Sequence, residues 1–419
     1  MNHFHYRTGA LHCEDAALED IADNVGTPAY VYSTATLERH YRVFREAFAP
    51  MEPLVAYAVK ANGNIAVIAT LAKLGAGADT VSAGEIARAL KAGVPPARIV
   101  FSGVGKTMDE LAFALDVGVH QINIESPPEL ALLMEACTAA KQRAAIAIRI
   151  NPDVGAGGHD KISTGKSGAK FGVGVEAAKT LYAEAHAHPS IDAKGLAVHI
   201  GSQIKDLAPL ESAFGVVRKL AENLRAQGLP VERLDLGGGL GVPYFNEPEP
   251  PSPADYAAMV KRVFDGFDAQ FSFEPGRLIA GNAGILLSRV VRVQQRPERD
   301  IVVIDAAMND LIRPAMYEAF HDIWPVREAR DGERKPVDVV GPVCETGDTF
   351  TRARPLPPLA AGDLVAFKTA GAYGAVMAST YNARALVPEV LVRGDRFEIV
   401  RRRWSVDEQL ALESIPSWQ

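Results

Sequence analysis

A lysine ends one of the apolar segments of this sequence. Lys60 closes the run Val-Ala-Tyr-Ala-Val-Lys of residues 55–60, and Ala, Asn and Gly follow it, as is typical where a strand ends. A buried ammonium costs free energy unless it is paired or used chemically. A desolvated lysine can form a Schiff base with a carbonyl compound such as pyridoxal phosphate. The alternative is a lysine whose head group simply reaches solvent, and the segment itself is compatible with both.

Polar residues or glycines also stand at the ends of most other apolar runs. They are Asp79 and Ser82, Glu125, Arg149 and Asn151, His199, Ser202 and Gln203, the glycines of 237–241, and Glu274 to Arg277. In a closed parallel barrel the carboxyl ends of all strands meet at one rim, where polar residues are usually catalytic. Any one of these residues could be structural, but their convergence on one rim predicts an active site there.

Two of these groups suggest how a flat, phosphorylated ligand could be held. His199 ends an otherwise apolar run, so it is either a core histidine or an imidazole that stacks on a ligand ring, and Ser202 could bond a phosphate. The turn at residues 237–241, which includes Gly238 and Gly239, can present backbone N–H groups to an anion. Its spacing is not Gly-x-Gly-x-x-Gly, which argues against a dinucleotide site. A phosphate site and a plain tight turn remain as the alternatives.

The segment Glu274-Pro275-Gly276-Arg277 carries two opposite charges. A salt bridge between Glu274 and Arg277 is the structural interpretation. The functional one places the carboxylate of Glu274 beside a pyridine nitrogen, where it would keep the ring protonated and strengthen it as an electron sink. Arg277 would then be available to bind a carboxylate through two parallel hydrogen bonds.

The elements that must position these residues follow a regular order. Eight apolar, strand-like runs alternate with helical patterns. They are Leu54–Ala61, Gly77–Ser82, Ile99–Gly103, Gln121–Ser126, Ala145–Pro152, Leu196–Gln203, Arg233–Gly241 and Phe271–Arg277. Eight alternating units predict an α/β fold of the TIM type, a (β/α)8 barrel, over residues 29–280. A Pro-rich loop, 242–254, interrupts the rhythm and has no assigned role.

The remaining residues predict a second kind of structure. After residue 280, short β-like runs follow one another without intervening helices, which predicts a C-terminal antiparallel β domain over 281–419. The first 28 residues match neither pattern and are expected to pack on this β domain. The domain carries three further clusters, each ambiguous by itself: Arg313 with Tyr317, Cys344 with Glu345, and Tyr373 between small residues.

Composition narrows the class of protein. The 419 residues include 44 Lys and Arg against 51 Asp and Glu, a net charge of −7, so nothing indicates binding to nucleic acid or to a membrane surface. The three cysteines are far apart and form neither a disulfide framework nor a metal-type pair, so no metal is expected. The polar N-terminal residues do not resemble a signal peptide, and a reducing cytoplasm is the expected location.

Taken in order, the motifs resemble the fold-type III pyridoxal-phosphate decarboxylases over nearly the whole chain. The matching segments are Tyr-Ala-Val-Lys60-Ala-Asn, His199-Ile-Gly-Ser-Gln, Gly-Gly-Gly239, Glu274-Pro-Gly-Arg277, Gly-Pro-Val-Cys344-Glu345 and Gly-Ala-Tyr373. The resemblance implies pyridoxal 5'-phosphate as cofactor. It also implies a homodimer with shared active sites, because Cys344 would reach the site of the neighbouring subunit.

The resemblance implies a role for each matching residue. Catalysis would involve Lys60, which carries the cofactor, Cys344 as proton donor, His199 and Glu274. The cofactor would be bound by Lys60, Asp79, His199, Ser202, Gly238, Gly239, Glu274, Pro275, Gly276, Arg277 and Tyr373. The substrate would be bound by Arg277, Arg313, Tyr317, Glu345 and Tyr373.

The expected substrate depends mainly on Glu345. Ornithine-type relatives typically carry Asp after the cysteine, whereas Glu, together with Arg277 and Arg313, suits a substrate with a second amino-acid centre. The loop 160–165 and the residues 170–172 also resemble the members that act on diaminopimelate. The function implied is decarboxylation of meso-2,6-diaminopimelate to L-lysine and CO₂. The alternatives are a decarboxylase of ornithine, lysine or arginine, a racemase, which Glu274 argues against, and a non-catalytic cofactor-binding homologue.

Overall fold

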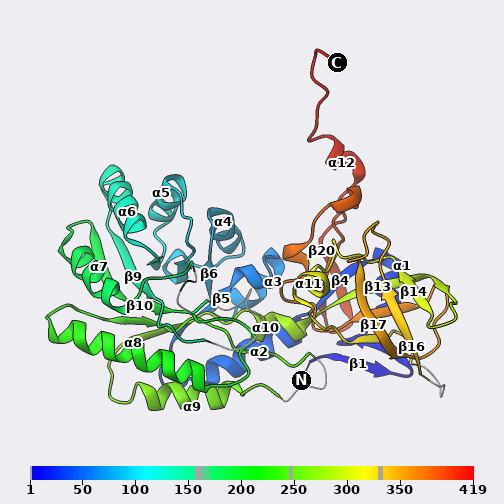
Figure 1. The fold of residues 1–419 in the computed structure, drawn as a ribbon, viewed down its shortest axis with the longest axis horizontal. Coiled ribbons are helices and arrows are strands. Elements are labelled where there is room, and N and C mark those ends of the chain that lie inside the picture. Colours follow the sequence, from blue (N-terminus) through cyan, green and yellow to red (C-terminus); the bar gives the residue numbers. More distant parts are fainter. Residues whose placement is uncertain (1, 156–163, 166–167, 169, 245–248, 329–333) are drawn as a thin grey trace. The chain divides into compact units, whose positions relative to one another are not determined.

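The computed structural model describes residues 2–155, 164–165, 168, 170–244, 249–328 and 334–419 (Figure 1). The chain forms two compact units. A barrel unit holds residues from Glu38 to Ile279, apart from Tyr244. A β unit holds the N-terminal residues up to Leu37, Tyr244, and the residues from Ala280 onward.

The barrel unit is built around a closed ring of parallel strands. The strands are β5 (Leu54–Ala58), β6 (Gly77–Thr80), β7 (Ile99–Phe101), β8 (Gln121–Ile124), β9 (Ala144–Ile150), β10 (Ile191–Val198), β11 (Arg233–Asp235) and β12 (Gln270–Phe273). They pair in chain order, and β12 returns to β5 to close the ring. Each of the eight predicted runs overlaps one of these strands, so the predicted (β/α)8 barrel is confirmed. The largest difference is β10, which begins at Ile191, five residues before the predicted run.

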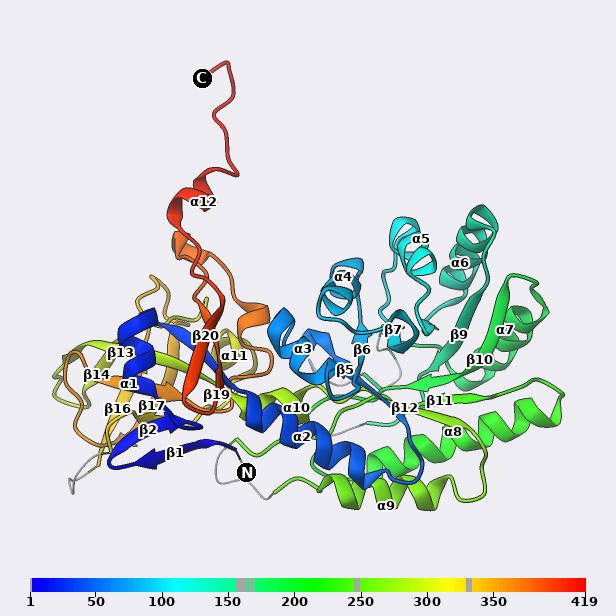
Figure 2. The same ribbon diagram turned by 180° about the vertical axis from the view of Figure 1, so that it is seen from behind.

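Helices lie outside this ring (Figures 1 and 2). They are α2 (Thr34–Ala47), α3 (Ile65–Ala72), α4 (Ala83–Lys91), α5 (Met108–Val117), α6 (Pro127–Ala140), α7 (Val175–Ala187), α8 (Ala208–Ala226), α9 (Pro253–Val263) and α10 (Arg277–Ala280). Their starts are encoded locally, since Ser82, Thr107 and Ser126 each accept a hydrogen bond from the third helical residue of α4, α5 and α6. Ser82, one of the polar residues expected at the rim, therefore caps a helix.

The β unit is mostly antiparallel, as predicted. Its large sheet has the order β17-β16-β14-β13-β4-β19-β20, with β18 on β13 and β15 on β18. The strands are β4 (Ala29–Ser33), β13 (Gly284–Gln294), β14 (Ile301–Ile304), β15 (Ile323–Pro325), β16 (Lys335–Val340), β17 (Thr349–Leu356), β18 (Leu364–Phe367), β19 (Glu389–Arg393) and β20 (Arg396–Arg401). Two neighbouring pairs, β14 with β16 and β19 with β4, are parallel.

Smaller elements complete both units. A three-stranded sheet contains β1 (Phe4–Arg7), β2 (Ala10–Cys13) and β3 (Ala16–Ala17). The short helices are α1 (Leu18–Val25), α11 (Arg313–Tyr317) and α12 (Val406–Leu410). The 3₁₀ turns are η1 (Val59–Ala61), η2 (Pro96–Arg98), η4 (Gly281–Ala283), η5 (Ala375–Met377) and η6 (Tyr381–Ala383).

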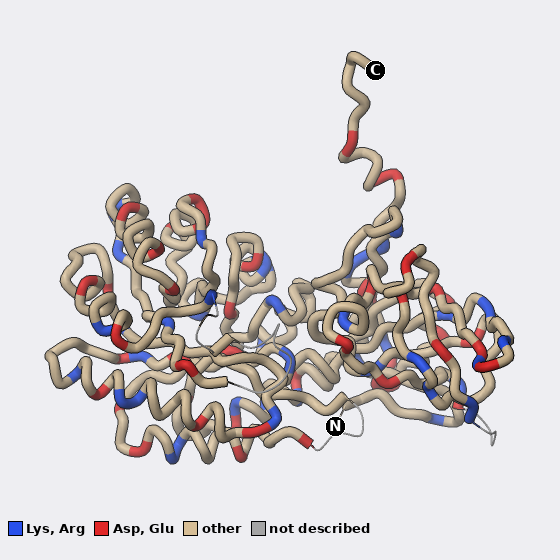
Figure 3. Tube along the Cα trace, in the orientation of Figure 1, with Lys and Arg blue, Asp and Glu red and all other residues tan. Residues whose placement is uncertain are grey.

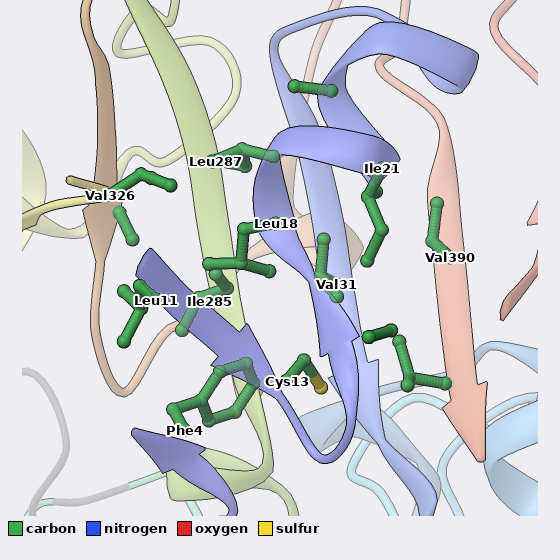
Figure 4. Close-up of a cluster of buried hydrophobic side chains, with 14 residues drawn as sticks. Phe4, Leu11, Cys13, Leu18, Ile21, Val31, Ile285, Leu287, Val326 and Val390 are labelled. Carbon is green, nitrogen blue, oxygen red and sulfur yellow. The ribbon is translucent and has the colours of Figure 1, made fainter. Parts of the chain in front are cut away.

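The N-terminal segment packs into the β unit. Phe4, Leu11, Cys13 and Leu18 lie in one buried cluster with side chains of β4, β13 and β19 (Figure 4). The boundary expected at residue 29 differs from the division in the structure, because β4 pairs with β13 and β19 and so belongs to the large sheet. The barrel unit begins only at Glu38, within α2.

Charge is distributed without a dominant sign. Lys and Arg are interspersed with Asp and Glu along the trace of both units (Figure 3). Among the described residues, no helix combines the length and the apolar character that a membrane span requires.

Candidate active site at the mouth of the barrel

Lys60 lies immediately after β5, in the turn η1. Its Nζ forms an ion pair with Oδ2 of Asp79, a residue of the neighbouring strand β6. The strand register explains the contact, since β5 and β6 pair Ala58 with Asp79. Asp79 is fully buried, whereas 35% of the Lys60 side chain is exposed. The lysine side chain is therefore partly open to solvent, while the buried carboxylate of Asp79 neutralises its charge.

The exposed part of Lys60 faces a cavity of about 450 Å³ within the barrel unit. Lys60, Arg149, His199 and Glu274 line it together with Asn123 and Phe171. These residues come from the carboxyl ends of β5, β8, β9, β10 and β12 or from the loops that follow them. Four of the predicted strand-end residues, Lys60, Arg149, His199 and Glu274, thus line one cavity, whereas Ser202, the glycines of 237–241 and Arg277 are not part of its lining.

His199 is held as a neutral ring. The backbone N–H of Gly238 donates to Nδ1 of His199 at 3.2 Å, so this nitrogen carries no proton. Burial, and then the nearby charges of Arg149 and Lys60, hold the pKa of His199 well below its usual value. A neutral, oriented imidazole at the cavity wall suits stacking on a flat ring.

The glycine turn is required by close backbone packing. A Cβ on Gly238 would lie 2.3 Å from the carbonyl oxygen of Glu274, and one on Gly239 would lie 2.6 Å from that of Gly201. Gly239 also has φ +118°, which side chains rarely adopt. The N–H of Gly238 is used to orient His199, so this glycine shapes the site through the ring as well as through its small size.

Glu274 places an unused acceptor beside the cavity. It is buried, and its Oε1 has no hydrogen-bond partner among the described residues. Burial and then the neighbouring carboxylates of Asp235 and Asp79 raise the pKa of Glu274 well above its usual value. Such a carboxyl takes up a proton unless a cation faces it. The arrangement therefore favours a ligand with a protonated ring nitrogen at this position.

Arg277 does not form the salt bridge with Glu274 that the structural interpretation of the sequence predicted. Its Nε and Nη2 donate to Oγ of Ser202 at 3.3 and 3.1 Å. No ion pair between Glu274 and Arg277 occurs in the described part of the chain. The segment between them packs on the lysine turn, since the carbonyl of Pro275 accepts from Ala58 N–H at 3.3 Å. A Cβ on Gly276 would lie 2.9 Å from the Cβ of Ala61.

A buried network of charges supports the cavity wall. Arg149 pairs with Oε1 of Glu125 at 2.9 Å, and this same oxygen accepts from Gly103 N–H at 2.9 Å. Behind them, Nζ of Lys106 lies 2.5 Å from Oε1 of Glu129, whose other oxygen accepts from Glu125 N–H at 3.0 Å. Glu125 and Arg149 were recognised in the sequence only as strand-end residues. Lys106 lies in a loop of ordinary composition that gave no signal.

The other predicted site residues lie in the β unit. Arg313 and Tyr317 are the first and last residues of α11. Cys344 and Glu345 are exposed on a turn, and the N–H of Cys344 donates to Oδ1 of Asn382 at 3.1 Å. Tyr373 is half-buried with φ +56°. Most of the loop 160–165 lies outside the described residues, but Thr164 donates to the carbonyl of His199 at 2.8 Å.

The donor set in the barrel unit fits pyridoxal 5'-phosphate. A partly exposed lysine can hold an aldehyde carbon, a neutral imidazole can face its ring, and an unpartnered buried carboxyl can face its nitrogen. The glycine turn next to His199 adds backbone N–H groups of the kind that bind phosphate. The lysine, the imidazole and the carboxyl line a single cavity.

Comparisons with known proteins agree with this reading. Residues 34–281 match the family described as pyridoxal-dependent decarboxylase, pyridoxal binding domain. A diaminopimelate decarboxylase of Zymomonas mobilis is 48% identical over 99% of each chain. The solved diaminopimelate decarboxylase of Helicobacter pylori, complexed with L-lysine, superposes with a TM-score of 0.91 at 39% identity, covering 94% of this chain and 98% of that one. The M. jannaschii enzyme with L-lysine gives 0.94 at 35% identity, covering 99% and 98%.

Proposed function

This chain belongs to the pyridoxal-dependent decarboxylases, close to their diaminopimelate-specific members, and we propose that it converts meso-2,6-diaminopimelate to L-lysine and CO₂. The reaction breaks the bond between the α-carbon of one amino-acid centre and its carboxylate, and a proton takes the place of the lost CO₂. It is the last step in making lysine. The observation that carries the proposal is the cavity that joins Lys60, the neutral His199 and the unpartnered carboxyl oxygen of Glu274.

The cofactor of this family is pyridoxal 5'-phosphate, and when bound it supplies a sink for the electrons that the departing CO₂ leaves behind. We assign Lys60 to hold it covalently and Asp79 to fix the lysine. His199 would face its ring, and Glu274 would keep its nitrogen protonated. Ser202, Gly238 and Gly239, with the backbone of residues 275–277 and with Tyr373, would hold the phosphate.

The residues of the β unit are assigned to the substrate. Arg277, Arg313, Tyr317, Glu345 and Tyr373 would bind it, with the arginines on its carboxylates and Glu345 on the amine of its far centre. Cys344 would return a proton to the α-carbon. Its exposed position on a turn suits this role, because a proton donor must reach a reacting atom that lies outside its own loop.

We further infer that the protein works as a homodimer in the cytoplasm. The family resemblance implies that Cys344 of one chain would reach the site of the other, and Cys344 is an exposed free thiol. If each site needs Lys60 from one chain and Cys344 from its partner, mixing inactive Lys60→Ala and Cys344→Ala proteins would restore about a quarter of the activity, since half of the dimers would have one intact site. No restored activity after subunit exchange would contradict a shared site.

The decisive experiment measures product formation from meso-diaminopimelate, lysine, ornithine and arginine, each with added pyridoxal phosphate. Lysine and CO₂ from diaminopimelate alone would support both the reaction and its specificity. Turnover of a different amino acid would overturn the substrate assignment and leave the decarboxylase chemistry standing. Absence of turnover with all four, despite bound cofactor, would favour a racemase or a non-catalytic homologue.

A further inference from the structure

The guanidinium of Arg313 contacts a histidine within the β unit. Arg313 is the first residue of α11 and only 6% exposed, and its Nη1 lies 2.8 Å from Nε2 of His321. His321 is itself only 3% exposed. The contact is therefore buried, and the atoms that form it can be assigned their roles from hydrogen-bond chemistry.

The protonation of His321 follows from its two partners. Nδ1 of His321 lies 2.9 Å from the carbonyl oxygen of Lys368, which can only accept, so Nδ1 carries the proton. Arginine can only donate, so Nε2 must offer its lone pair to Arg313. The ring is thus neutral, with both nitrogens engaged. A neutral acceptor fixes the direction of a guanidinium without cancelling its charge, as a carboxylate would.

A second ring contacts the same guanidinium. The Arg313 Cζ lies 4.7 Å from the centre of the Tyr244 ring, and that ring meets His321 edge to face, at 5.5 Å and 86°. A cation over an aromatic face is attracted by the ring's quadrupole. Tyr244 belongs to the Pro-rich loop 242–254, which the sequence left without a role. It gives Arg313 a second point of support from a distant part of the chain.

We propose that His321 and Tyr244 are positioning residues, which hold the guanidinium of Arg313 in the orientation in which it binds a carboxylate of the amino-acid substrate. The proposal rests on the proposed function and deepens it, because it explains how one substrate-binding residue is kept charged and oriented. The competing interpretation is that His321 is only a satisfied core histidine and that Tyr244 only covers it.

Two substitutions at His321 separate these interpretations. In His321→Asn the side-chain amide can still donate to the Lys368 carbonyl but is too short to reach Arg313. In His321→Gln the amide oxygen can take the place of Nε2. In the holoenzyme we expect His321→Asn to raise KM for meso-diaminopimelate about tenfold, the loss of one hydrogen bond to a charged group, with kcat within about twofold. His321→Gln should instead leave KM close to the wild-type value.

Tyr244 supplies an independent pair of variants that does not depend on how the His321 variants fold. Tyr244→Phe keeps the aromatic face and should keep KM, whereas Tyr244→Leu removes it and should raise KM by about threefold, the value of a partly exposed cation–π contact. In an Arg313→Lys background, His321→Asn or Tyr244→Leu should raise KM little further, because the effects of substitutions at interacting residues are not additive.

The outcomes also distinguish this proposal from the proposed function. If the wild-type protein turns over meso-diaminopimelate but His321→Asn and Tyr244→Leu leave KM unchanged, the positioning roles are overturned and the function stands. A fall in kcat or thermal stability with KM unchanged would point to a purely structural role. If the wild-type protein does not turn over diaminopimelate at all, the proposed function itself has failed.

Discussion

Lys60 and Asp79 form an ion pair between neighbouring strands of the barrel, with the carboxylate fully buried and the ammonium partly open to the cavity. Only Oδ2 of Asp79 is engaged, because Oδ1 has no hydrogen-bond partner in the described residues. A buried carboxylate with one unused oxygen is expensive if its cation is removed. The pair therefore links the chemistry of the site to the stability of the barrel.

Replacing Lys60 by alanine should abolish turnover. Without its Nζ the cofactor has no covalent attachment, and we expect kcat to fall at least about 1000-fold. The fold should remain, but with a lower melting temperature, because Asp79 loses its cation. Circular dichroism and steady-state assays check both expectations, and a Lys60→Ala, Asp79→Asn double variant should recover part of the lost stability. Near-normal turnover of Lys60→Ala would refute the assigned role.

Glu274→Gln should lower kcat while leaving the protein folded. An amide cannot hold a cation at the ring nitrogen, and loss of a hydrogen bond between charged groups corresponds to a decrease of about 10- to 100-fold. Glu14→Gln is the matched control, since that carboxylate is also buried but lies in the β unit, where it accepts from Ser33 Oγ and Ala35 N–H. The control should change stability rather than kcat. An equal kcat in wild type and Glu274→Gln would remove Glu274 from the mechanism.

Gly239→Ala should impair cofactor binding. The added Cβ would lie 2.6 Å from the carbonyl of Gly201 in a backbone conformation, φ +118°, that alanine avoids, so the turn must shift. We expect the affinity for added pyridoxal phosphate, measured by absorbance titration, to fall at least about tenfold. Gly215→Ala in α8 is the control, because its Cβ meets nothing within 4 Å. Equal affinity in both variants would show that the turn does not hold the cofactor.

Cys344 should be the thiol that reacts first in the native protein. It is exposed, whereas Cys13 and Cys137 are buried. An aromatic disulfide reagent should therefore label one thiol rapidly, and this rapid labelling should be absent in Cys344→Ala. The same variant should have a kcat about 100-fold lower than wild type, as expected when a general acid is removed. Rapid labelling that persists in Cys344→Ala would mean that another cysteine opens to solvent. Unchanged kcat would exclude Cys344 as the proton donor.

His120 should make stability depend on pH. Burial, and then the charge of Arg233, lower the pKa of His120 to about 4 in the folded protein, against about 6.5 unfolded. Between these values the unfolded chain binds a proton that the folded chain does not, so the free energy of unfolding falls as pH drops from 6.5 towards 4. Allowing for its partial exposure, the loss is about 2 kcal/mol.

Urea unfolding at pH 7.5 and pH 5 tests this assignment. The wild-type protein should lose more stability over this interval than His120→Gln, which cannot titrate. Equal losses in the two proteins would show that other groups account for the acid sensitivity.

The barrel was predictable because its signal is repeated. Eight runs alternate with helices, and the strand ends carry the residues that line the cavity, so pattern and chemistry point to the same rim. The range expected for the barrel, 29–280, included β4, whose five residues are all buried in the structure, as those of a barrel strand would be. Only pairing with β13 and β19, more than 250 residues away, reveals its true sheet. β17 is hard to recognise in the sequence, because an edge strand tolerates its Pro355 and its exposed Arg352.

The supports of the site were harder to predict than its ligand-facing residues. Lys106, Glu129 and His321 act through other side chains, and their neighbours in space are far away in the sequence. A buried charge has no local pattern that distinguishes it from a solvated one. Tyr244 illustrates the same limit, since the residues that it contacts, Arg313 and His321, follow it by 69 and 77 positions in the sequence.

The placement of β4 has a consequence for how the protein is made. A ribosome releases β4 early, but its partner strands β13 and β19 emerge only after the whole barrel has been synthesised. The barrel sequence lies between them as an insertion and can fold on its own during translation. The apolar N-terminal residues therefore stay exposed to solvent until β19, one of the last strands, has been synthesised. Chains that stop short of β19 would therefore contain a folded barrel and a β4 strand with an unpaired, apolar edge. Intermediates with such exposed edges are the kind that chaperones bind.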